Sequence, residues 1–375
     1  MTSVRENLAG RRIAVCVGPG GVGKTTVAAA LALGRALDGA RALVCTIDPA
    51  RRLANALGLS TLGNVESRVP DHKFAEAGLR PKGALFAMML DVKRTWDDLV
   101  TRHAPEPARR ERILRNRLYQ QMSSALAGSQ EYMAMEKLYE LATDRDYDVI
   151  VLDTPPTAHA LDFLEAPDRI LDFLGNETAR ALLAPAAAAG KLGLRLAQLG
   201  GGYIAKTLAR FTGQAVLSDL GEFLQGFHGM YEGFKERAAA VHALLSTPEV
   251  GFVLVTTPNP VAIGEVLAFH ERLHAESMPI AGVVANRLTP DLWPGRGPLP
   301  SASDLVPALR AAGADADALA ERLARTLGEH QALAVAERRA LERLFASLTA
   351  PRSLVPRLEP DVHDLAGLAR LYERL

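Results

Sequence analysis

The chain has 375 residues, of which 48% are hydrophobic and 23% charged, and its 43 basic residues balance 43 acidic ones. This composition is typical of a soluble globular protein and excludes an intrinsically disordered chain. Because the formal net charge is zero, no overall field draws the chain to nucleic acid, and we expect no nucleic-acid partner. The length suits one large α/β domain, so we predict a single domain over residues 1–375.

Neither a membrane span nor a leader is expected from the apolar pattern. No apolar run approaches the roughly 18 residues that a membrane helix needs, which predicts no transmembrane segment. The first residues, MTSVRENLAGRR, lack the apolar centre of a signal peptide. These features predict a cytoplasmic protein. The two cysteines, Cys16 and Cys45, fall within predicted strands, where buried free thiols are expected.

Short apolar runs alternate with helix-compatible segments along the chain. The first run is followed by KTTVAAALALGRAL at 24–37, which is rich in helix formers and predicts a helix. The runs predict strands at residues 12–17, 42–47, 84–90, 149–152, 251–256 and 280–285. Continuous apolar strands that alternate with helices indicate a mostly parallel, doubly wound α/β sheet, covered on both faces.

Two long inserts separate these predicted strands. Residues 92–146 are charged and helix-prone, whereas residues 168–246 are helix-compatible and rich in small or apolar residues. In the second insert, Phe223, Phe227, Met230 and Phe234 recur at helical spacing. The stripe fits either a face buried against other helices or a surface for an apolar client or partner subunit. A Pro-rich connector, 288–304, precedes a predicted helical segment at 305–349.

The segment GPGGVGKTT, residues 18–26, matches two nucleotide-binding patterns at once. Gly18, Gly20 and Gly23 match the dinucleotide pattern G-x-G-x-x-G, which assigns no task to a lysine. In the phosphate-loop pattern G-x-x-x-x-G-K-[ST], every matched residue has a role in nucleotide binding, including Lys24 and Thr25. Because the segment joins a predicted strand to a predicted helix, we assign it as the phosphate loop of a P-loop NTPase fold that binds ATP and Mg²⁺.

Each residue of this loop has an expected task. Backbone N–H groups would surround the β-phosphate, and the helix that begins near Lys24 adds its positive end. Lys24 would neutralise the β- and γ-phosphate oxygens, and the Thr25 hydroxyl would ligate Mg²⁺. The nucleotide contacts expected here are Gly20, Gly21, Val22, Gly23, Lys24, Thr25 and Thr26.

Two acidic residues end predicted strands. Asp48 ends the second strand, where it could orient a water for attack on the γ-phosphate, directly or through the Mg²⁺ shell, or cap the next helix. Both roles are compatible. Asp153 ends the strand VIVL in the Walker-B arrangement, which holds Mg²⁺ through water. The segment after it is a candidate switch that senses the γ-phosphate.

Four segments occur in the chain in this order: GPGGVGKTT, TIDPARRLANALG, VIVLDTPPTAHALDFL and VVANRL. Together they resemble the ArsA-type ATPase family, which includes the arsenite-pump and tail-anchored-protein targeting ATPases. The resemblance implies ATP hydrolysis, with Asp48 positioning the attacking water. It implies that Asn286 reads the adenine edge and that residues 355–371 close over the adenine, with contacts from Pro356 and Leu358. It also implies a homodimer or a pairing with a similar subunit, and a hydrophobic client or a membrane-protein partner.

One position departs from the family pattern in the loop itself. The family usually has a lysine that reaches the partner's nucleotide, and this chain has Pro19 there. Proline supplies no cation, so another residue would have to take this role. Arg51 and Arg52 are candidates, although both also fit exposed charges at a helix end. The family's arsenite-binding cysteines and C-x-x-C zinc motif have no counterpart.

The sequence therefore predicts a Mg-dependent ATPase whose nucleotide-driven conformational change acts on a partner. Two other interpretations use the same loop. One is a nucleotide-binding module with little or no hydrolysis, which Pro19 favours. The other is a P-loop phosphotransferase acting on a small metabolite, which would require an acceptor pocket with a general base.

Overall fold

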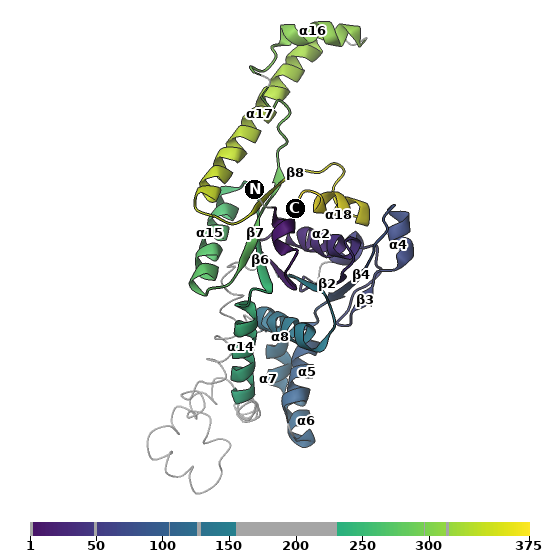
Figure 1. Ribbon diagram of the computed structural model, residues 1–375, viewed down its shortest axis with the longest axis vertical. Helices are drawn as coiled ribbons and strands as arrows, with labels where there is room; N and C mark the ends of the chain where they lie inside the picture. The colour runs from purple at the N-terminus through teal and green to yellow at the C-terminus, as the bar shows by residue number, and fades with distance from the viewer. Residues whose placement is uncertain are drawn as a thin grey trace, which may run out of the picture.

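A computed structural model describes residues 3–48, 51–104, 106–125, 129–154, 231–295, 297–312 and 315–375. Its centre is an eight-stranded sheet in the order β3-β4-β2-β5-β1-β6-β7-β8 (Figure 1). The strands are β1 (Ile13–Val17), β2 (Arg41–Thr46), β3 (Ser67–Arg68), β4 (Ala84–Met89), β5 (Val149–Asp153), β6 (Val250–Thr256), β7 (Ile280–Leu288) and β8 (Arg352–Pro356). All neighbouring strands run parallel except β3 and β4.

Helices cover both faces of the sheet because its strands are apolar on both sides. Along β1, Ile13, Val15 and Val17 join one core, and Ala14 and Cys16 join the other. The first core contains residues of α5 (Val92–His103), α6 (Pro107–Arg115), α7 (Arg117–Ala125), α8 (Ser129–Asp144), α14 (Tyr231–Leu245), α15 (Pro260–Ala275) and α17 (Ala316–Ala346). The second contains residues of α1 (Val4–Leu8), α2 (Lys24–Leu37), α3 (Arg52–Ala56), α4 (Asp71–Glu76) and α18 (Leu365–Tyr372). This confirms the predicted doubly wound α/β fold.

The predicted elements agree closely with the observed ones. The helix at 24–37 has the predicted bounds, and a strand lies at each of the six predicted positions. Cys16 and Cys45 are buried free thiols, as expected. The sequence patterns missed β3 and β8. With two residues, β3 is too short to show a period, and β8 is an edge strand whose side chains are only partly buried.

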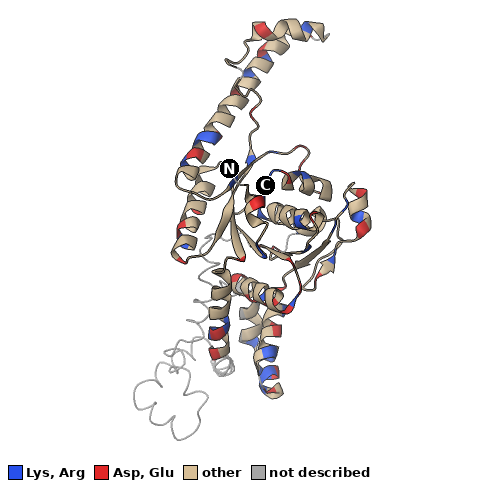
Figure 2. Cartoon of the chain, in the orientation of Figure 1, with Lys and Arg blue, Asp and Glu red and all other residues tan. Residues whose placement is uncertain are grey.

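The described residues between β4 and β5 form four helices, α5 to α8, and α14 packs against α8 beside them (Figure 1). The rings of Trp96, Tyr132 and Phe234 meet in the core of this group, with centroids 6.0–6.2 Å apart. Arg237 Nε donates to buried Glu136 at 2.8 Å, which ties α14 to α8. Arginines gather on α6 (Figure 2). Of the predicted apolar stripe, only Phe234 is among the described residues; the rest of the predicted second insert before 231 lies outside them.

The predicted helical segment at 305–349 consists of two helices, α16 (Ala302–Ala311) and the 31-residue α17. They pair at their far ends and extend beyond the sheet (Figure 1). The connector after β7 runs along α17, where His330 Nε2 lies 2.8 Å from the Pro290 carbonyl and Arg338 forms a 2.7 Å ion pair with Asp291. Among the described residues, no helix combines the length and apolarity required to cross a membrane.

The packing of α18 on α2 depends on a glycine. The ring of Tyr372 lies so close to Gly34 that a Cβ on this residue would overlap it. Tyr372 is 4% exposed, and its hydroxyl donates to Asp38 at 2.8 Å. The guanidinium of Arg5 stacks on the same ring, 4.3 Å from its centroid. These contacts hold the ring in place, so α18 can approach α2 this closely only over a glycine.

Gly34→Ala is therefore expected to destabilise the protein. In an open helix this change stabilises by about 0.5–1 kcal/mol, whereas overpacking a core costs about 1–3 kcal/mol. We expect the overlap to dominate and the free energy of unfolding, measured by chemical denaturation, to fall by roughly 1–2 kcal/mol. Gly264→Ala in α15 is the matched control, because its Cβ would meet nothing within 4 Å. A gain in stability for both variants would contradict the packing argument.

Candidate functional site

The loop between β1 and α2 has the tight backbone of a phosphate loop. Gly18, Gly21 and Gly23 have φ values of 148°, 77° and 98°, in the left-handed region that favours glycine. A Cβ on Gly18 would overlap the Val255 carbonyl, and one on Gly23 would overlap the Asn286 amide. Gly20 and Gly21 are exposed at the tip, whereas Val22 is buried. The loop thus fits closely between the ends of β6 and β7.

Lys24, the first residue of α2, turns its ammonium group back into this loop. Nζ donates to the carbonyls of Gly18 at 2.8 Å and Pro19 at 2.9 Å, and the residue is 6% exposed. Burial lowers the pKa of Lys24, and the nearby carboxylates, Asp153 first and then Asp48, act in the opposite direction. The Lys24 ammonium group is therefore buried against the phosphate loop, and the carboxylates of Asp153 and Asp48 both act on its pKa.

Asp153 is the most deeply buried acid of this site. Its Oδ2 accepts a 2.7 Å hydrogen bond from Thr46, and the residue is 1% exposed. Burial raises the pKa of Asp153 to about 6, although the Thr25 and Thr46 hydroxyls and the Lys24 ammonium all lower it. Its other oxygen, Oδ1, is buried and has no hydrogen-bond partner among the described residues.

Thr46 links the two acidic strand ends. β2 and β5 are neighbours, and Thr46 pairs with Asp153 in their register. Its hydroxyl donates to Asp153 and accepts from the Asp48 amide at 3.2 Å. Asp48 is partly buried, and its carboxylate raises the pKa values of both Lys24 and Asp153. The structure thus brings Lys24, Asp48 and Asp153 together, as parallel strands that end at one edge should.

The segments that follow these two acids are only partly described. Thr154, the first residue after Asp153, donates its hydroxyl to the Cys16 carbonyl at 2.8 Å and so bridges β5 to β1. The rest of the predicted switch lies outside the described residues, as do residues 49 and 50. Arg51 and Arg52 are exposed at the start of α3.

β7 ends beside the phosphate loop and contacts it through two side chains. Asn286 Nδ2 donates to the Val22 carbonyl at 2.8 Å, and Asn286 Oδ1 accepts from the Arg287 amide at 2.9 Å. Arg287 Nη1 donates to the Gly21 carbonyl at 2.8 Å. Sequence reasoning identified Asn286 but missed Arg287. The signal was present, because Arg287 directly follows Asn286 in VVANRL.

A cavity of about 500 Å³ opens next to this loop. Ligand pockets typically enclose about 300–1,000 Å³, so its volume is in the range for a small ligand. It combines apolar side chains with two arginines, and four lining residues are ones that the sequence singled out for the nucleotide: Thr26, Asn286, Pro356 and Leu358. The other lining residues are Arg287, Arg357, Asp361, Val362 and Leu371.

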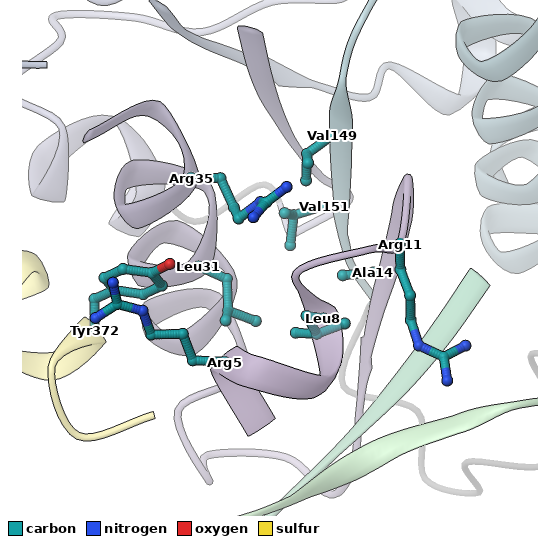
Figure 3. Close-up of a pocket in the computed structure, with 9 residues that line it drawn as sticks. All are labelled: Arg5, Leu8, Arg11, Ala14, Leu31, Arg35, Val149, Val151 and Tyr372. Atoms are coloured by element: carbon teal, nitrogen blue, oxygen red, sulfur yellow. The ribbon is translucent and has the colours of Figure 1, made fainter. Parts of the chain in front are cut away.

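A second, much smaller cavity lies under α1 and α2, near the start of β5 (Figure 3). Its volume is about 10 Å³, which is close to the minimum for one water molecule. Arg35 reaches into it beside Val149 and Val151 (Figure 3). This cavity is too small for a nucleotide, whereas the volume and lining of the cavity beside the loop make that cavity a candidate ligand site.

The residues present fit a magnesium ion that is held mainly through phosphate and water. Asp153 Oδ1 is an unpartnered buried acceptor, and Thr25 lies next to Lys24 at the start of α2. Across the described ranges, no group of three His, Cys, Asp or Glu side chains could hold a metal ion without other ligands. Mg²⁺ commonly keeps several waters and binds one or two carboxylates plus substrate phosphates.

The sequence pattern of the anion-transporting ATPase family matches residues 11–293, from just before β1 into the connector after β7. This match covers more than half of the chain. The chain belongs to the anion-transporting ATPase family. The resemblance to ArsA-type ATPases seen in the motifs is thereby confirmed.

Individual relatives are similar at moderate identity. The ATPase GET3 of Rhodotorula glutinis is 27% identical over 256 residues, which cover 68% of this chain and 61% of that protein. The ATPase GET3B of Arabidopsis thaliana is 26% identical over 293 residues, or 73% and 63% of the two chains. An uncharacterized protein of Streptomyces coelicolor is 32% identical over 160 residues, 42% and 38% of the two. The match spans less than two thirds of each relative's length.

The raised pKa of Asp153 predicts a stability cost that depends on pH. A carboxyl that binds its proton more tightly when folded makes the protein less stable as the pH rises from about 4 to above 6. A pKa of about 6 against the ordinary 3.8 corresponds to about 3 kcal/mol. Asp153→Asn removes this charge, so we expect the variant to gain about 2–3 kcal/mol over the wild type at pH 7.5 and much less at pH 4.5.

Denaturant unfolding of the nucleotide-free protein at the two pH values measures this difference. Asp71→Asn, at an exposed carboxylate with a side chain 76% accessible, controls for the substitution itself. The same stability difference between Asp153→Asn and the wild type at both pH values would refute the explanation.

Proposed function

We propose that this protein is a Mg-dependent ATPase that hydrolyses the β–γ bond of ATP. The observation that supports this most directly is the meeting of Lys24, Asp48 and Asp153 behind one phosphate loop, beside a cavity of about 500 Å³. A loop alone would serve any phosphate ligand. Two carboxylates at the adjacent strand ends add the means to manage a metal and a water.

The phosphate end of the site would work through the loop and the lysine. The amides of residues 20–25 would hold the β-phosphate, and the Lys24 ammonium would exchange the Gly18 and Pro19 carbonyls for phosphate oxygens. Bound Mg²⁺ would neutralise charge on the β- and γ-phosphate oxygens. Thr25 and Asp153 would hold its coordination shell, and Asp48, from the same side, would contact that shell and orient the water for in-line attack.

The adenine end of the nucleotide would occupy the cavity. The residues that line the cavity include Asn286, Pro356, Leu358 and Thr26. Thr26 lies directly after the phosphate-loop residues in the chain. An asparagine amide can donate to and accept from a base edge. Here the amide of Asn286 also bonds to Val22 and Arg287, so its orientation is fixed before any base arrives. This supports adenine recognition by Asn286 as a proposal.

A conformational change caused by nucleotide binding would be transmitted by β5, the strand that ends at Asp153. α8 leads into β5, and α14, tied to α8 by the Arg237–Glu136 pair, leads into β6. A shift at Asp153 and Thr154 would therefore reach the helical group α5–α8. We propose that this group responds to nucleotide and acts on a hydrophobic client or a membrane protein, and that the protein works as a homodimer or with a similar subunit.

A second candidate function is nucleotide binding with little hydrolysis, and Pro19 favours it. The Pro19 carbonyl accepts from Lys24, and the residue is buried, so nothing at this position can reach a second nucleotide. The two functions share the same site and differ only in the chemical step. The substitution below separates them.

Asp48→Asn is expected to lower steady-state phosphate release at least 100-fold and to change ATP affinity less than about threefold. The amide keeps the size of the side chain but cannot polarise an attacking water as a carboxylate does. Lys24→Ala is expected to abolish both binding and release, because the loop loses its cation. Malachite-green phosphate detection and calorimetry with Mg-ATP measure the two quantities.

Equal, background-level release from the wild type and Asp48→Asn, with ATP affinity intact in both, would reject hydrolysis and favour the binding module. Asp317→Asn is the control, since it removes an exposed carboxylate on α17, away from the loop, and should leave both quantities unchanged.

A further inference from the structure

Two consecutive residues of β7, Asn286 and Arg287, both bond to the phosphate loop. In a regular strand, successive side chains point to opposite faces, so two neighbours cannot contact one loop in this way. The strand is irregular at this point. The β7–β8 pairing joins Ala285 to Leu354 and then Leu288 to Pro356, which leaves one extra residue on β7. Such a β-bulge redirects side chains and is over-represented next to active sites.

The backbone of Arg287 completes this redirection. Its φ is 59°, a left-handed conformation that is uncommon and unfavourable for residues other than glycine. The conformation allows the guanidinium to reach the Gly21 carbonyl while Asn286 holds the Val22 carbonyl. An unfavourable backbone conformation persists when the surrounding contacts favour it, and the loop supplies those contacts here.

Holding a carbonyl also fixes the direction of an amide. Within one planar trans peptide unit, the C=O and the N–H point in opposite directions. The Gly21 carbonyl shares its peptide unit with the Val22 N–H, and the Val22 carbonyl shares its unit with the Gly23 N–H. When Arg287 and Asn286 hold these two carbonyls on the β7 side, both amides must face away from β7. These amides belong to the set expected to surround the β-phosphate.

We infer that Arg287, together with Asn286, clamps the phosphate loop in its anion-binding conformation and is a positioning residue for any di- or triphosphate bound there. The inference rests on the proposed nucleotide site and goes beyond it, because it assigns Arg287 to the loop rather than to the base or the ribose. The guanidinium also adds a positive charge next to a loop in which Pro19 supplies none.

The test compares Arg287→Met with the wild type in two measurements. Calorimetry uses Mg-ATP and, separately, inorganic triphosphate, which has neither base nor ribose. Hydrogen exchange follows the amides of Val22 and Gly23 in the nucleotide-free protein. We expect the variant to bind both ligands at least tenfold more weakly and to exchange these two amides severalfold faster.

Two further variants isolate the guanidinium. Arg287→Gly removes it and relieves the left-handed backbone, and we expect the same loss as in Arg287→Met. Arg370→Met removes one exposed arginine on α18 that does not line the cavity, and should match the wild type in both measurements.

Two results would overturn the inference: unchanged triphosphate affinity in Arg287→Met, or full affinity in Arg287→Gly. A loss confined to ATP would place Arg287 on the base or ribose. If the wild type bound neither ligand, the proposed function would fail, and hydrogen exchange would decide the clamp independently.

Discussion

An anion held by backbone amides requires several N–H groups to face one point, and this forces the opposite carbonyls of the same peptide units outward. Those carbonyls need partners. In this protein Asn286 and Arg287, at the end of β7, donate to the carbonyls of Val22 and Gly21. The loop conformation therefore depends on a strand about 260 residues later in the chain, and only the complete sheet brings the two together.

The acids of the site illustrate a conflict between stability and function. A carboxylate buried as deeply as Asp153 opposes folding, and the Thr25 and Thr46 hydroxyls and the Lys24 ammonium offset only part of that cost. Thr46 also accepts from the Asp48 amide, so one threonine holds the ends of two strands in a fixed relation. Functional sites commonly retain such unfavourable buried charges, because their chemistry uses ionisable groups whose pKa is shifted from the ordinary value.

The sequence predicted most of the fold because its signals are local. Continuous apolar runs predicted the central strands, and the glycines with Lys24 and Thr25 predicted the loop before any contact was known. The predicted strand ends indicated that Asp48 and Asp153 would each lie beside the phosphate loop. Each of these inferences needs only the order of residues and the geometry of one element.

Features set by contacts between distant segments could not be predicted in this way. β3 is too short for a pattern, and β8 is recognised as a strand only by its pairing with β7. Arg287 resembled an ordinary surface arginine, because its role depends on a bulge and a left-handed backbone that no periodicity reveals. The tight fit of Gly34 under Tyr372 likewise needs the last helix to be in place.

The long helix that leaves the sheet has a mechanical consequence. With 31 residues and a rise of 1.5 Å per residue, α17 is about 46 Å long. Its inner end packs on β7, the strand that carries Asn286 and Arg287, and its outer end carries α16. As a rigid rod, it would amplify rotation: a tilt of about 5° at the base would displace the tip by about 4 Å over this length.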